Sequence, residues 1–299
     1  MQAIVNVNGR IGDAREPLLP VFDHGFLYGE GVYETLRTYN RMPFLFERHM
    51  RRLRASAGMI ALPVPLDDGE FLARVDTTMA ALSGSGEAYI RILLTRGVGD
   101  LSYDPSATPT PSIVIIVKPF VEPPVRTIEQ GITVATVSIL RNHPGSVNPL
   151  IKSNNLLNNA LAMQEALRKG AEEAVMRNYR GEIAECSQSN LFVVRGAAAL
   201  TPPLDAGLLP GITREFVFEI GREIGVPVTE AVLRPDDLLT ADEAFVTGTT
   251  RELTPVVRVD DHVVGTGKPG PITKRLLDSF HARALQLSQR KSQLAGKRT

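Results

Sequence analysis

A proline-rich run divides this chain into two parts of unequal length. Residues 118–124 read Lys-Pro-Phe-Val-Glu-Pro-Pro, with three prolines in seven positions. Proline removes a backbone donor and blocks helix, so the run is not expected to continue a helix or a central strand. The 299 residues of the chain are enough for two domains. We therefore expect a small domain over residues 1–118, an interdomain linker over 119–125 and a larger domain over 126–299.

Both parts mix strand-like and helix-like segments. β-Branched and aromatic residues predict strands at 31–39, 88–95, 112–118, 131–140, 173–177, 182–185 and 190–194. Apolar residues at helical spacing predict helices at 48–59, 71–82, 154–169 and 213–225. The polar and basic segment after about Ala282 is typical of a frayed helix end. The expected class is therefore mixed α/β in both domains.

Composition narrows the kind of partner. Lys+Arg and Asp+Glu are each 33, so the formal net charge is zero and does not favour nucleic acid or an anionic membrane. The longest apolar stretch, residues 113–117, is too short to span a bilayer, and residues 1–10 alternate and turn at Asn8-Gly9 like a hairpin, unlike a signal peptide. The single cysteine, Cys186, excludes an intrachain disulfide and favours a cytoplasmic location. We expect a small-molecule partner.

Lys152 is the first candidate for a reactive side chain. It lies between the apolar pair Leu150-Ile151 and the polar start of a predicted helix at Ser153-Asn154-Asn155. Partial burial there would leave more of the amine neutral, and the neutral amine is the nucleophile that forms a Schiff base. Most lysines instead extend the ammonium group to solvent, and this segment alone leaves that alternative open.

Glu185 is a candidate for holding a protonated ring nitrogen. It lies within residues 181–192, Gly-Glu-Ile-Ala-Glu-Cys-Ser-Gln-Ser-Asn-Leu-Phe. If Ile183 and Cys186 bracket the end of a strand, the carboxylate between them could project into a site. A solvated glutamate in a surface turn is the alternative. Cys186 itself is interpreted as a small packing residue.

Two later segments are typical of anion-binding loops. Residues 209–214 open a predicted helix, whose first backbone N–H groups and dipole suit a phosphate, although an ordinary N-cap by Thr213 would explain the same residues. Residues 246–255 place a glycine among small hydroxyl residues, which can present amides and hydroxyls to an anion. A plain turn between two strands is the alternative for the second segment.

Taken together and in this order, the four segments resemble the cofactor-binding set of the class IV aminotransferases. That family includes branched-chain aminotransferases, D-amino-acid aminotransferases and aminodeoxychorismate lyases. Residues 22–34, Phe-Asp-His-Gly-Phe-Leu-Tyr-Gly-Glu-Gly-Val-Tyr-Glu, resemble its first signature, residues 47–53 its His-x-x-Arg-Leu element, and residues 211–214 its phosphate loop. The resemblance runs from the N-terminal hairpin to about Ala282. It implies the two-domain fold type IV, with a barrel-like sheet in the larger domain, pyridoxal 5′-phosphate (PLP) as cofactor, no metal, and at least a homodimer.

The resemblance also implies roles for single residues. Lys152 would hold PLP as a Schiff base and carry the proton that leaves the substrate Cα. Glu185 would keep the pyridine nitrogen protonated, so that the ring accepts electrons from Cα. Arg52 would bind the phosphate, and Arg141, eleven positions before Lys152, would lie near the ring or else form a surface ion pair. The remaining phosphate ligands would be Ile212, Thr213 and Thr249.

A second set of residues would bind the substrate. Tyr89-Ile90-Arg91 matches the Tyr-x-Arg of branched-chain aminotransferases, in which the tyrosine helps to hold the α-carboxylate and the arginine reaches the distal carboxylate of glutamate. An arginine paired with a surface acid is the alternative for Arg91. Tyr33 and Arg37 share one face of a predicted strand, where Arg37 could bind a carboxylate or lie at the rim. Thr250 completes the predicted substrate set.

The motifs point to different branches of the family. Thr95-Arg96-Gly97 matches the D-amino-acid enzymes, but residues 98–103 lack the Arg-x-His pair that follows there. Leu157 stands where branched-chain enzymes usually have tyrosine, and Tyr33 fits the D-type pattern. We expect transfer of the amino group of branched-chain L-amino acids to 2-oxoglutarate. D-amino-acid or amine transamination and aminodeoxychorismate lyase activity are alternatives, and a silent metabolite-binding protein is disfavoured by the joint presence of Lys152, Glu185 and Arg52.

Overall fold

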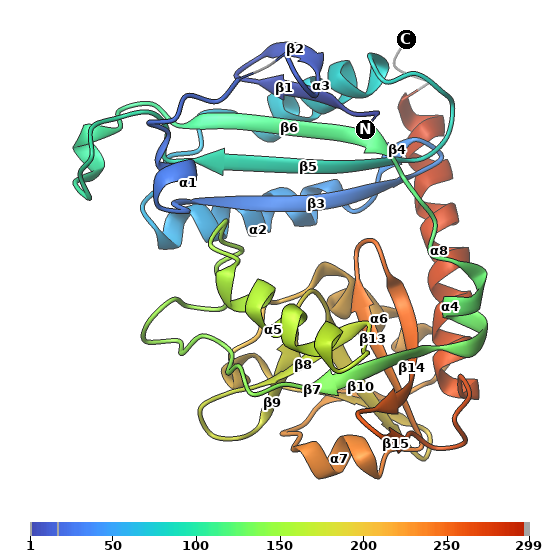
Figure 1. The fold of residues 1–299 in the computed structure, drawn as a ribbon. Coiled ribbons are helices and arrows are strands. Elements are labelled where there is room, and N and C mark those ends of the chain that lie inside the picture. The colour runs from blue at the N-terminus through green and yellow to red at the C-terminus, as the bar shows by residue number, and fades with distance from the viewer. Residues whose placement is uncertain (1, 17, 296–299) are drawn as a thin grey trace. The chain divides into compact units, whose positions relative to one another are not determined.

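The chain forms two compact units in this computed structural model, which describes residues 2–16 and 18–295 (Figure 1). Unit 1 comprises Met1–Val121, Ile151–Asn155 and Leu285–Thr299, and unit 2 comprises Glu122–Leu150 and Leu156–Ala284. Two short stretches from the later part of the chain thus group with the N-terminal part. The domain limits expected at residues 119–125 stay a prediction. Strand β6 ends at Pro119, and helix α4 begins at Val125.

Unit 1 is built on an antiparallel sheet. Within the described residues this sheet has six strands in the order β2-β1-β6-β5-β3-β4. The strands are β1 (Ile4–Val7), β2 (Arg10–Asp13), β3 (Gly31–Tyr39), β4 (Met42–Pro43), β5 (Ala88–Thr95) and β6 (Ser112–Pro119). The helical segments are α1 (His24–Leu27), α2 (Phe46–Met59), α3 (Asp68–Ala80) and the 3-10 turn η1 (Pro105–Ala107).

One face of this sheet packs against α2 and α3. Along β3 the residues alternate, so that Val32 and Leu36 are buried in the core with Met50 and Leu53 of α2 and Phe71 of α3. Period-two alternation of apolar residues is what a strand covered on one side requires. Every second residue of β3, β5 and β6 therefore lies on the opposite face, which neither helix covers.

Unit 2 contains a mixed sheet and most of the helices (Figure 1). Its strand order in the described part of the chain is β12-β11-β10-β13-β14-β7-β8-β9, with β15 paired to β14. The strands are β7 (Ile132–Thr136), β8 (Glu173–Arg177), β9 (Ile183–Cys186), β10 (Asn190–Arg195), β11 (Ala198–Thr201), β12 (Val228–Glu230), β13 (Glu243–Gly248), β14 (Glu252–Val259) and β15 (His262–Val263). The helical segments are α4 (Val125–Gln130), α5 (Leu157–Arg168), η2 (Leu204–Ala206), α6 (Ile212–Ile224), α7 (Pro235–Leu239) and the first part of α8 (Pro271–Ala295), a helix that belongs to unit 1 from Leu285 onward.

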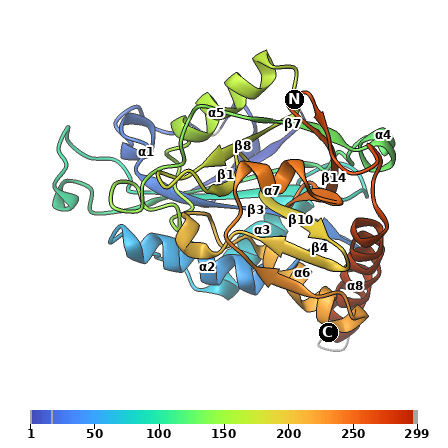
Figure 2. The same ribbon diagram turned by 90° about the horizontal axis from the view of Figure 1, so that it is seen from below.

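The unit 2 sheet curls around its own apolar core, as the fold type IV expectation required. Val175, Val193 and Val246 belong to this core, whereas the neighbouring side chains on the other face pack against helices. Ala174 lies with the α5 residues of a separate cluster, and Phe192 contacts an aromatic ring of α6. Helix α5 beside β8 is also visible in Figure 2. The mixed α/β class is confirmed in both units.

The C-terminal segment differs from its expectation. Helix α8 continues from Pro271 to Ala295, so the frayed end expected after Ala282 is wrong over the described part of the segment. The side chain of Ala284 is fully buried, and the Ser288 hydroxyl accepts a bond from Asn40 Nδ2, so α8 is stabilised by tertiary contacts that its polar sequence does not indicate. Lys297 and Arg298 lie outside the described residues. No helix in the described ranges combines the length and hydropathy of a membrane span.

Candidate active site

The backbone of Lys152 is hydrogen-bonded to other residues of unit 1. Its N–H donates to Ser56 Oγ (3.1 Å), and its carbonyl accepts from the Tyr33 N–H (3.0 Å). Asn154 N–H donates to the Gly31 carbonyl (2.9 Å), so residues 152–154 run along the edge of β3 like a short added strand. Because the backbone is held at three points, the direction in which the lysine side chain leaves it is defined.

A buried ion cluster lies beneath this attachment. Glu34, on the core side of β3, is fully buried and accepts from Arg52 Nε and Nη2, both at 2.8 Å, and from His49 Nδ1 at 2.7 Å. His49, Arg52 and Ser56 follow one another at helical spacing on α2, so one helix face provides both partners of Glu34 and the hydroxyl that holds Lys152.

The charges in this cluster set its protonation. Burial alone would raise the pKa of Glu34, but the charge and hydrogen bonds of Arg52, together with His49, hold that pKa at about 2. Burial lowers the pKa of His49, which Glu34 partly offsets, while the positive charges of Arg52 and Lys152 lower it further. Since an ionised Glu34 can only accept, His49 donates from Nδ1, and its neutral ring keeps Nε2 as an acceptor. Arg52, predicted as a phosphate ligand, thus uses Nε and Nη2 for Glu34.

Tyr33 links the lysine to a second cation. Lys152 Nζ lies 4.4 Å and Arg91 Cζ 4.1 Å from the centroid of the Tyr33 ring. A ring face attracts cations but accepts no conventional hydrogen bond, so both groups keep their donors. The structure therefore brings together Lys152, Tyr33 and Arg91, as the sequence predicted for a reactive centre.

The other predicted substrate residues of unit 1 lie on the same sheet face. Arg37 pairs with Tyr89 across β3 and β5, which confirms that Arg37 shares a face with Tyr33. Arg37 is only 3% exposed, and its Cζ lies 3.8 Å from the Phe120 ring centroid and 4.3 Å from that of Tyr39. Its guanidinium is therefore packed between aromatic rings, unlike a solvent-exposed rim residue.

Glu185 is buried at the end of β9 in unit 2. Arg141 Nε donates to its Oε1 (2.7 Å), while Asn190 Nδ2 (3.3 Å) and the Leu209 N–H (3.1 Å) donate to Oε2. The two side chains of the ion pair are 9% and 7% exposed, so Arg141 belongs to a buried pair and not to a surface one. The alternative of a solvated Glu185 is likewise excluded.

Helix α6 begins without a side-chain cap. Its N-cap is Gly211, so the interpretation of Thr213 as the cap is wrong; Thr213 lies within the first turn and is buried. A Cβ at Gly211 would lie 1.9 Å from Asn190 Oδ1, which explains the glycine. The first N–H groups of the helix, including those of Ile212 and Thr213, have no intrahelical acceptor and suit an anion.

Threonines follow β13 near the same part of unit 2. Thr249 and Thr250 form the turn between β13 and β14 and are partly buried. Thr247, which pairs with Asn190 across β10 and β13, is 1% exposed, and its hydroxyl finds no hydrogen-bond partner among the described residues. A buried, unsatisfied hydroxyl beside a hydroxyl-rich turn is the chemistry that a phosphorylated ligand would complete, so the residues present fit PLP.

Cys186 does not act as a nucleophile in this setting. It is buried, and desolvation, reinforced by the charge of Glu173, raises the pKa of its thiol well above the usual value. A thiol that stays protonated is inert, which supports its interpretation as a packing residue.

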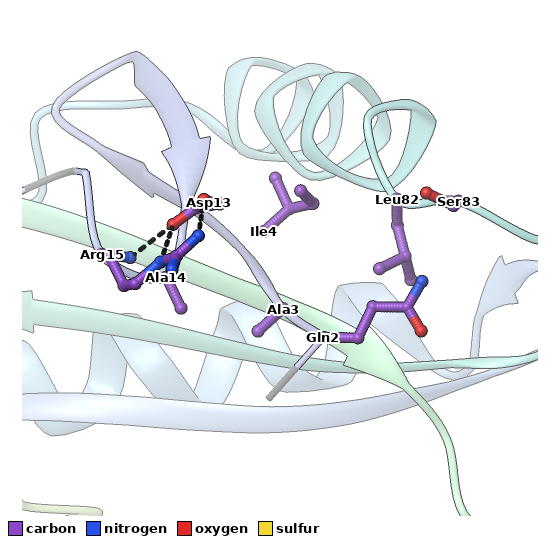
Figure 3. A pocket seen from close by; sticks show the side chains of 8 residues that line it. All are labelled: Gln2, Ala3, Ile4, Asp13, Ala14, Arg15, Leu82 and Ser83. Atoms are coloured by element: carbon purple, nitrogen blue, oxygen red, sulfur yellow. Dashed lines mark hydrogen bonds and ion pairs between the residues drawn. The ribbon is translucent and has the colours of Figure 1, made fainter.

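The pocket in Figure 3 lies away from these residues. It has a volume of about 440 Å³ and is lined by Gln2, Ala3, Ile4, Asp13, Ala14, Arg15, Leu82 and Ser83. Its charged members, Asp13 and Arg15, are paired with each other at 3.0 Å. No predicted site residue lines this pocket. We therefore place the candidate active site at the residues around Lys152 and Glu185, whose chemistry suits a cofactor, and not at this pocket. Within the described ranges no group of His, Cys, Asp or Glu could hold a metal ion.

Sequence reasoning missed several polar residues that support the predicted ones. Glu34 and His49 were present in the motifs but received no role, because their pairing joins a strand to a helix 15 positions away. Ser56, Asn190 and Thr247 carry no local signal, since only the folded backbone brings them to their partners. The motif order predicted the site residues, and the tertiary structure adds polar residues that contact them.

Comparisons with known proteins agree with this chemistry. Residues 31–259 match the family "Amino-transferase class IV". The chain is 38% identical to a putative branched-chain-amino-acid aminotransferase of Methanocaldococcus jannaschii over 92% of this chain and 94% of that one. It is 35% identical to a D-alanine aminotransferase of Listeria innocua, again over 92% and 94%. The crystal structure of the Escherichia coli branched-chain amino acid aminotransferase superposes with a TM-score of 0.89 at 32% identity, covering 93% of each chain. The chain belongs to the class IV aminotransferases, enzymes that use PLP to transfer amino groups between amino acids and 2-oxo acids.

Proposed function

We propose that this enzyme transfers the amino group of branched-chain L-amino acids to 2-oxoglutarate, with Lys152 as the catalytic residue. The observation that carries the proposal is the attachment of Lys152, whose backbone is held by Ser56 and β3 and whose Nζ lies on the Tyr33 ring beside Arg91. The branched-chain relatives in the comparisons support the same substrate class.

Each site residue has a defined task in this proposal. PLP, when bound, supplies a ring that withdraws electrons from the substrate Cα. Lys152 holds the cofactor covalently, and its Nζ then moves the proton that leaves Cα. Glu185, which accepts from Arg141, Asn190 and the Leu209 N–H, holds the proton on the pyridine nitrogen.

The cofactor phosphate is assigned to groups with donors to offer. The first amides of α6 at Ile212 and Thr213, the Thr213 and Thr249 hydroxyls and the Arg52 guanidinium are proposed as its ligands. Arg52 is oriented by the Glu34 carboxylate, which accepts from its Nε and Nη2. Ordering the arginine before binding lowers the entropy lost when the phosphate binds.

The substrate is assigned to the uncovered sheet face of unit 1. Tyr89 binds the α-carboxylate and Arg91 the distal carboxylate of glutamate or 2-oxoglutarate, because a guanidinium matches a carboxylate bidentately. Tyr33 and Arg37 shape the same face, and Thr250 offers a hydroxyl and an amide to the carboxylate.

Transamination of D-amino acids is the second candidate, supported by the likeness to the Listeria enzyme and by Leu157 at the start of α5. Against it, residues 98–103 lack the Arg-x-His pair that follows Thr-Arg-Gly in the D-amino-acid enzymes, and the remaining Arg96 pairs with Glu30 and donates to the carbonyls of Ile60 and Ala61. It cannot serve as a free carboxylate ligand in that position. We favour the branched-chain L-amino acids.

The test is a pair of spectroscopic measurements on the purified protein with PLP. We expect an absorption band in the wild type whose reduction by borohydride fixes the cofactor covalently to the protein, and no such fixation in Lys152→Ala, while Lys274→Ala serves as the control for an exposed lysine. L-Leucine is then expected to convert the band and D-alanine is not. Conversion by D-alanine alone would replace the first candidate by the second, and the lack of a band would refute the cofactor role of Lys152.

We also propose that the enzyme is a cytoplasmic homodimer. The buried, unpaired Cys186 is consistent with a reducing compartment, and the class IV resemblance implies at least a dimer. Light scattering coupled to gel filtration gives the mass, and a monomer with full activity would contradict this proposal.

A further inference from the structure

The uncovered sheet face of unit 1 carries cations on three adjacent strands. Arg37 of β3, Tyr89 of β5 and Lys118 of β6 stand in one row across the sheet, and Arg91 stands two positions further along β5. The alternating side chains that share this face on the three strands include no Asp or Glu. The ionisable side chains of these three strands on this face therefore carry positive charge only.

Two of these cations are stabilised by rings alone. Lys118 Nζ lies 4.7 Å from the centroid of the Tyr89 ring, and Arg91 Cζ lies 4.1 Å from that of Tyr33. Among the described residues neither forms a salt bridge or a side-chain hydrogen bond. A ring stabilises the charge yet leaves the N–H donors unsatisfied, so both cations stay available to an anion.

Two other arginines of the same unit, one buried and one largely buried, are neutralised by carboxylates. These pairs are Arg52 with Glu34 and Arg96 with Glu30. Arg91 and Lys118, which have no carboxylate partner among the described residues, differ in this respect from Arg52 and Arg96. Cations without a carboxylate partner are expected where a negatively charged substrate supplies the countercharge.

Arg91 and Lys118 are close enough to act on one carboxylate. Arg91 pairs with Ile116, two positions from Lys118, so Arg91 and Lys118 are diagonal neighbours on antiparallel strands. Diagonal neighbours lie about 7–8 Å apart at their backbones, within reach of long side chains. A forked guanidinium and a compact ammonium can then bind the two oxygens of one carboxylate from different sides.

We propose that Lys118 is a specificity-determining residue that binds, together with Arg91, the distal carboxylate of a dicarboxylic amino or oxo acid. The inference rests on the proposed function, in which a dicarboxylate is one of the two substrates. Leu93 and Ile116 flank Arg91 on the same face. The aliphatic side chain of a branched-chain substrate would therefore contact Leu93 and Ile116, whereas the distal carboxylate of a dicarboxylate would contact the two cations. Lys118 thereby sets the balance between the two substrate classes.

Substitution of Lys118 tests this inference. Lys118→Met keeps the length of the side chain and removes its charge, and Lys118→Arg keeps the charge. We expect kcat/KM for 2-oxoglutarate, divided by kcat/KM for 4-methyl-2-oxopentanoate, to fall about two- to fivefold in Lys118→Met, the size of one partly exposed charge interaction. Lys118→Arg is expected to restore most of the ratio, and Lys274→Met, which removes an exposed lysine on α8, to leave it at the wild-type value.

Binding of unreactive acids separates this inference from the proposed function. Glutarate and 4-methylpentanoate are titrated into the PLP-loaded enzyme, and the dissociation constant of glutarate is expected to rise about two- to fivefold in Lys118→Met relative to that of 4-methylpentanoate. Equal changes for both acids, or none for glutarate, would overturn the role of Lys118. A wild type that binds glutarate through Lys118 but does not convert L-leucine would instead refute the branched-chain function alone.

Discussion

At the scale of single residues, the Glu34 cluster is expected to dominate the stability of unit 1. Glu34→Gln would remove the negative charge that pairs with Arg52 and would replace one of the oxygens that accept from Arg52 and His49 by an amide donor. Breaking a buried ion pair on one side costs roughly 3–5 kcal/mol of the free energy of unfolding. Denaturant titration measures this loss, and Glu129→Gln, at an exposed position of α4, is the matched control with an expected change within about 0.5 kcal/mol. A similar small change in both variants would contradict the role of the cluster.

The same cluster gives the stability a defined dependence on pH. His49 has a lowered pKa in the folded chain, so the unfolded chain binds its proton first as the pH falls below about 6.5, and stability decreases there. Glu34, with its folded pKa at about 2, contributes stability that is present above its ordinary value of 4.5 and is lost as the pH falls toward 2. Denaturant titrations between pH 7 and pH 3 are expected to show both losses. Glu34→Gln is expected to flatten the lower one.

Substitution of Thr247 is expected to affect the binding of PLP without lowering the stability of the enzyme. Its buried hydroxyl has no partner within the described residues, so Thr247→Val is expected to leave the stability of the cofactor-free enzyme equal or higher. If the hydroxyl bonds to PLP, the dissociation constant of PLP rises about fivefold, equivalent to about 1 kcal/mol. Equilibrium dialysis measures it, with Thr229→Val at an exposed position of β12 as control. An unaltered constant would show that Thr247 takes no part in binding.

At the scale of elements, the contact between β3 and the Lys152 segment depends on Gly31. A Cβ there would lie 2.5 Å from Asn154 Nδ2 and 2.6 Å from the Leu94 carbonyl, and the second of these is backbone that cannot move aside. Gly31→Ala is therefore expected to displace residues 152–154 and to reduce the fraction of PLP that borohydride fixes to the protein by several-fold.

A glycine in an open position gives the matched control for this substitution. Gly58 lies within α2, and a Cβ there would meet nothing within 4 Å, so Gly58→Ala is expected to stabilise the helix by about 0.5–1 kcal/mol and to leave the trapped fraction at the wild-type level. Loss of trapping in both variants would point to a general effect on folding. Full trapping in Gly31→Ala would show that the close contact does not position Lys152.

Local pattern predicted the elements whose burial follows from their own sequence. β3, β5 and β8 have the expected limits because β-branched and apolar residues begin and end with the strand. The start of α6 lies within one residue of its prediction, but its N-cap is Gly211 instead of Thr213, and the glycine is required by a tertiary contact with Asn190. The end of α8 was missed because a polar helix is stabilised by partners elsewhere in the chain. Register and strand order, such as the parallel pairing of β14 with β7, have no local signal at all.

At the scale of the whole molecule, motif order predicted the family, the fold class and the cofactor, which the comparisons confirm. The residues of the site stay proposals, and so does the oligomeric state. What the sequence could not supply is the pairing of distant charges. The contacts of Glu34 with Arg52, of Arg141 with Glu185 and of Lys118 with the Tyr89 ring arise only once the fold places strands and helices together.

The attachment of residues 151–155 to unit 1 has a consequence for engineering the enzyme. A gene cut at the proline-rich run would give an N-terminal fragment without its added edge strand and without the lysine, both of which are encoded after the cut. The two units are therefore not interchangeable modules. A chimaera that joins halves of different family members at the proline-rich run would pair the β3 edge of one parent with the lysine segment of the other. Crossover points placed on either side of residues 151–155, so that this segment stays with the β3 edge of its own parent, would keep the pairing intact.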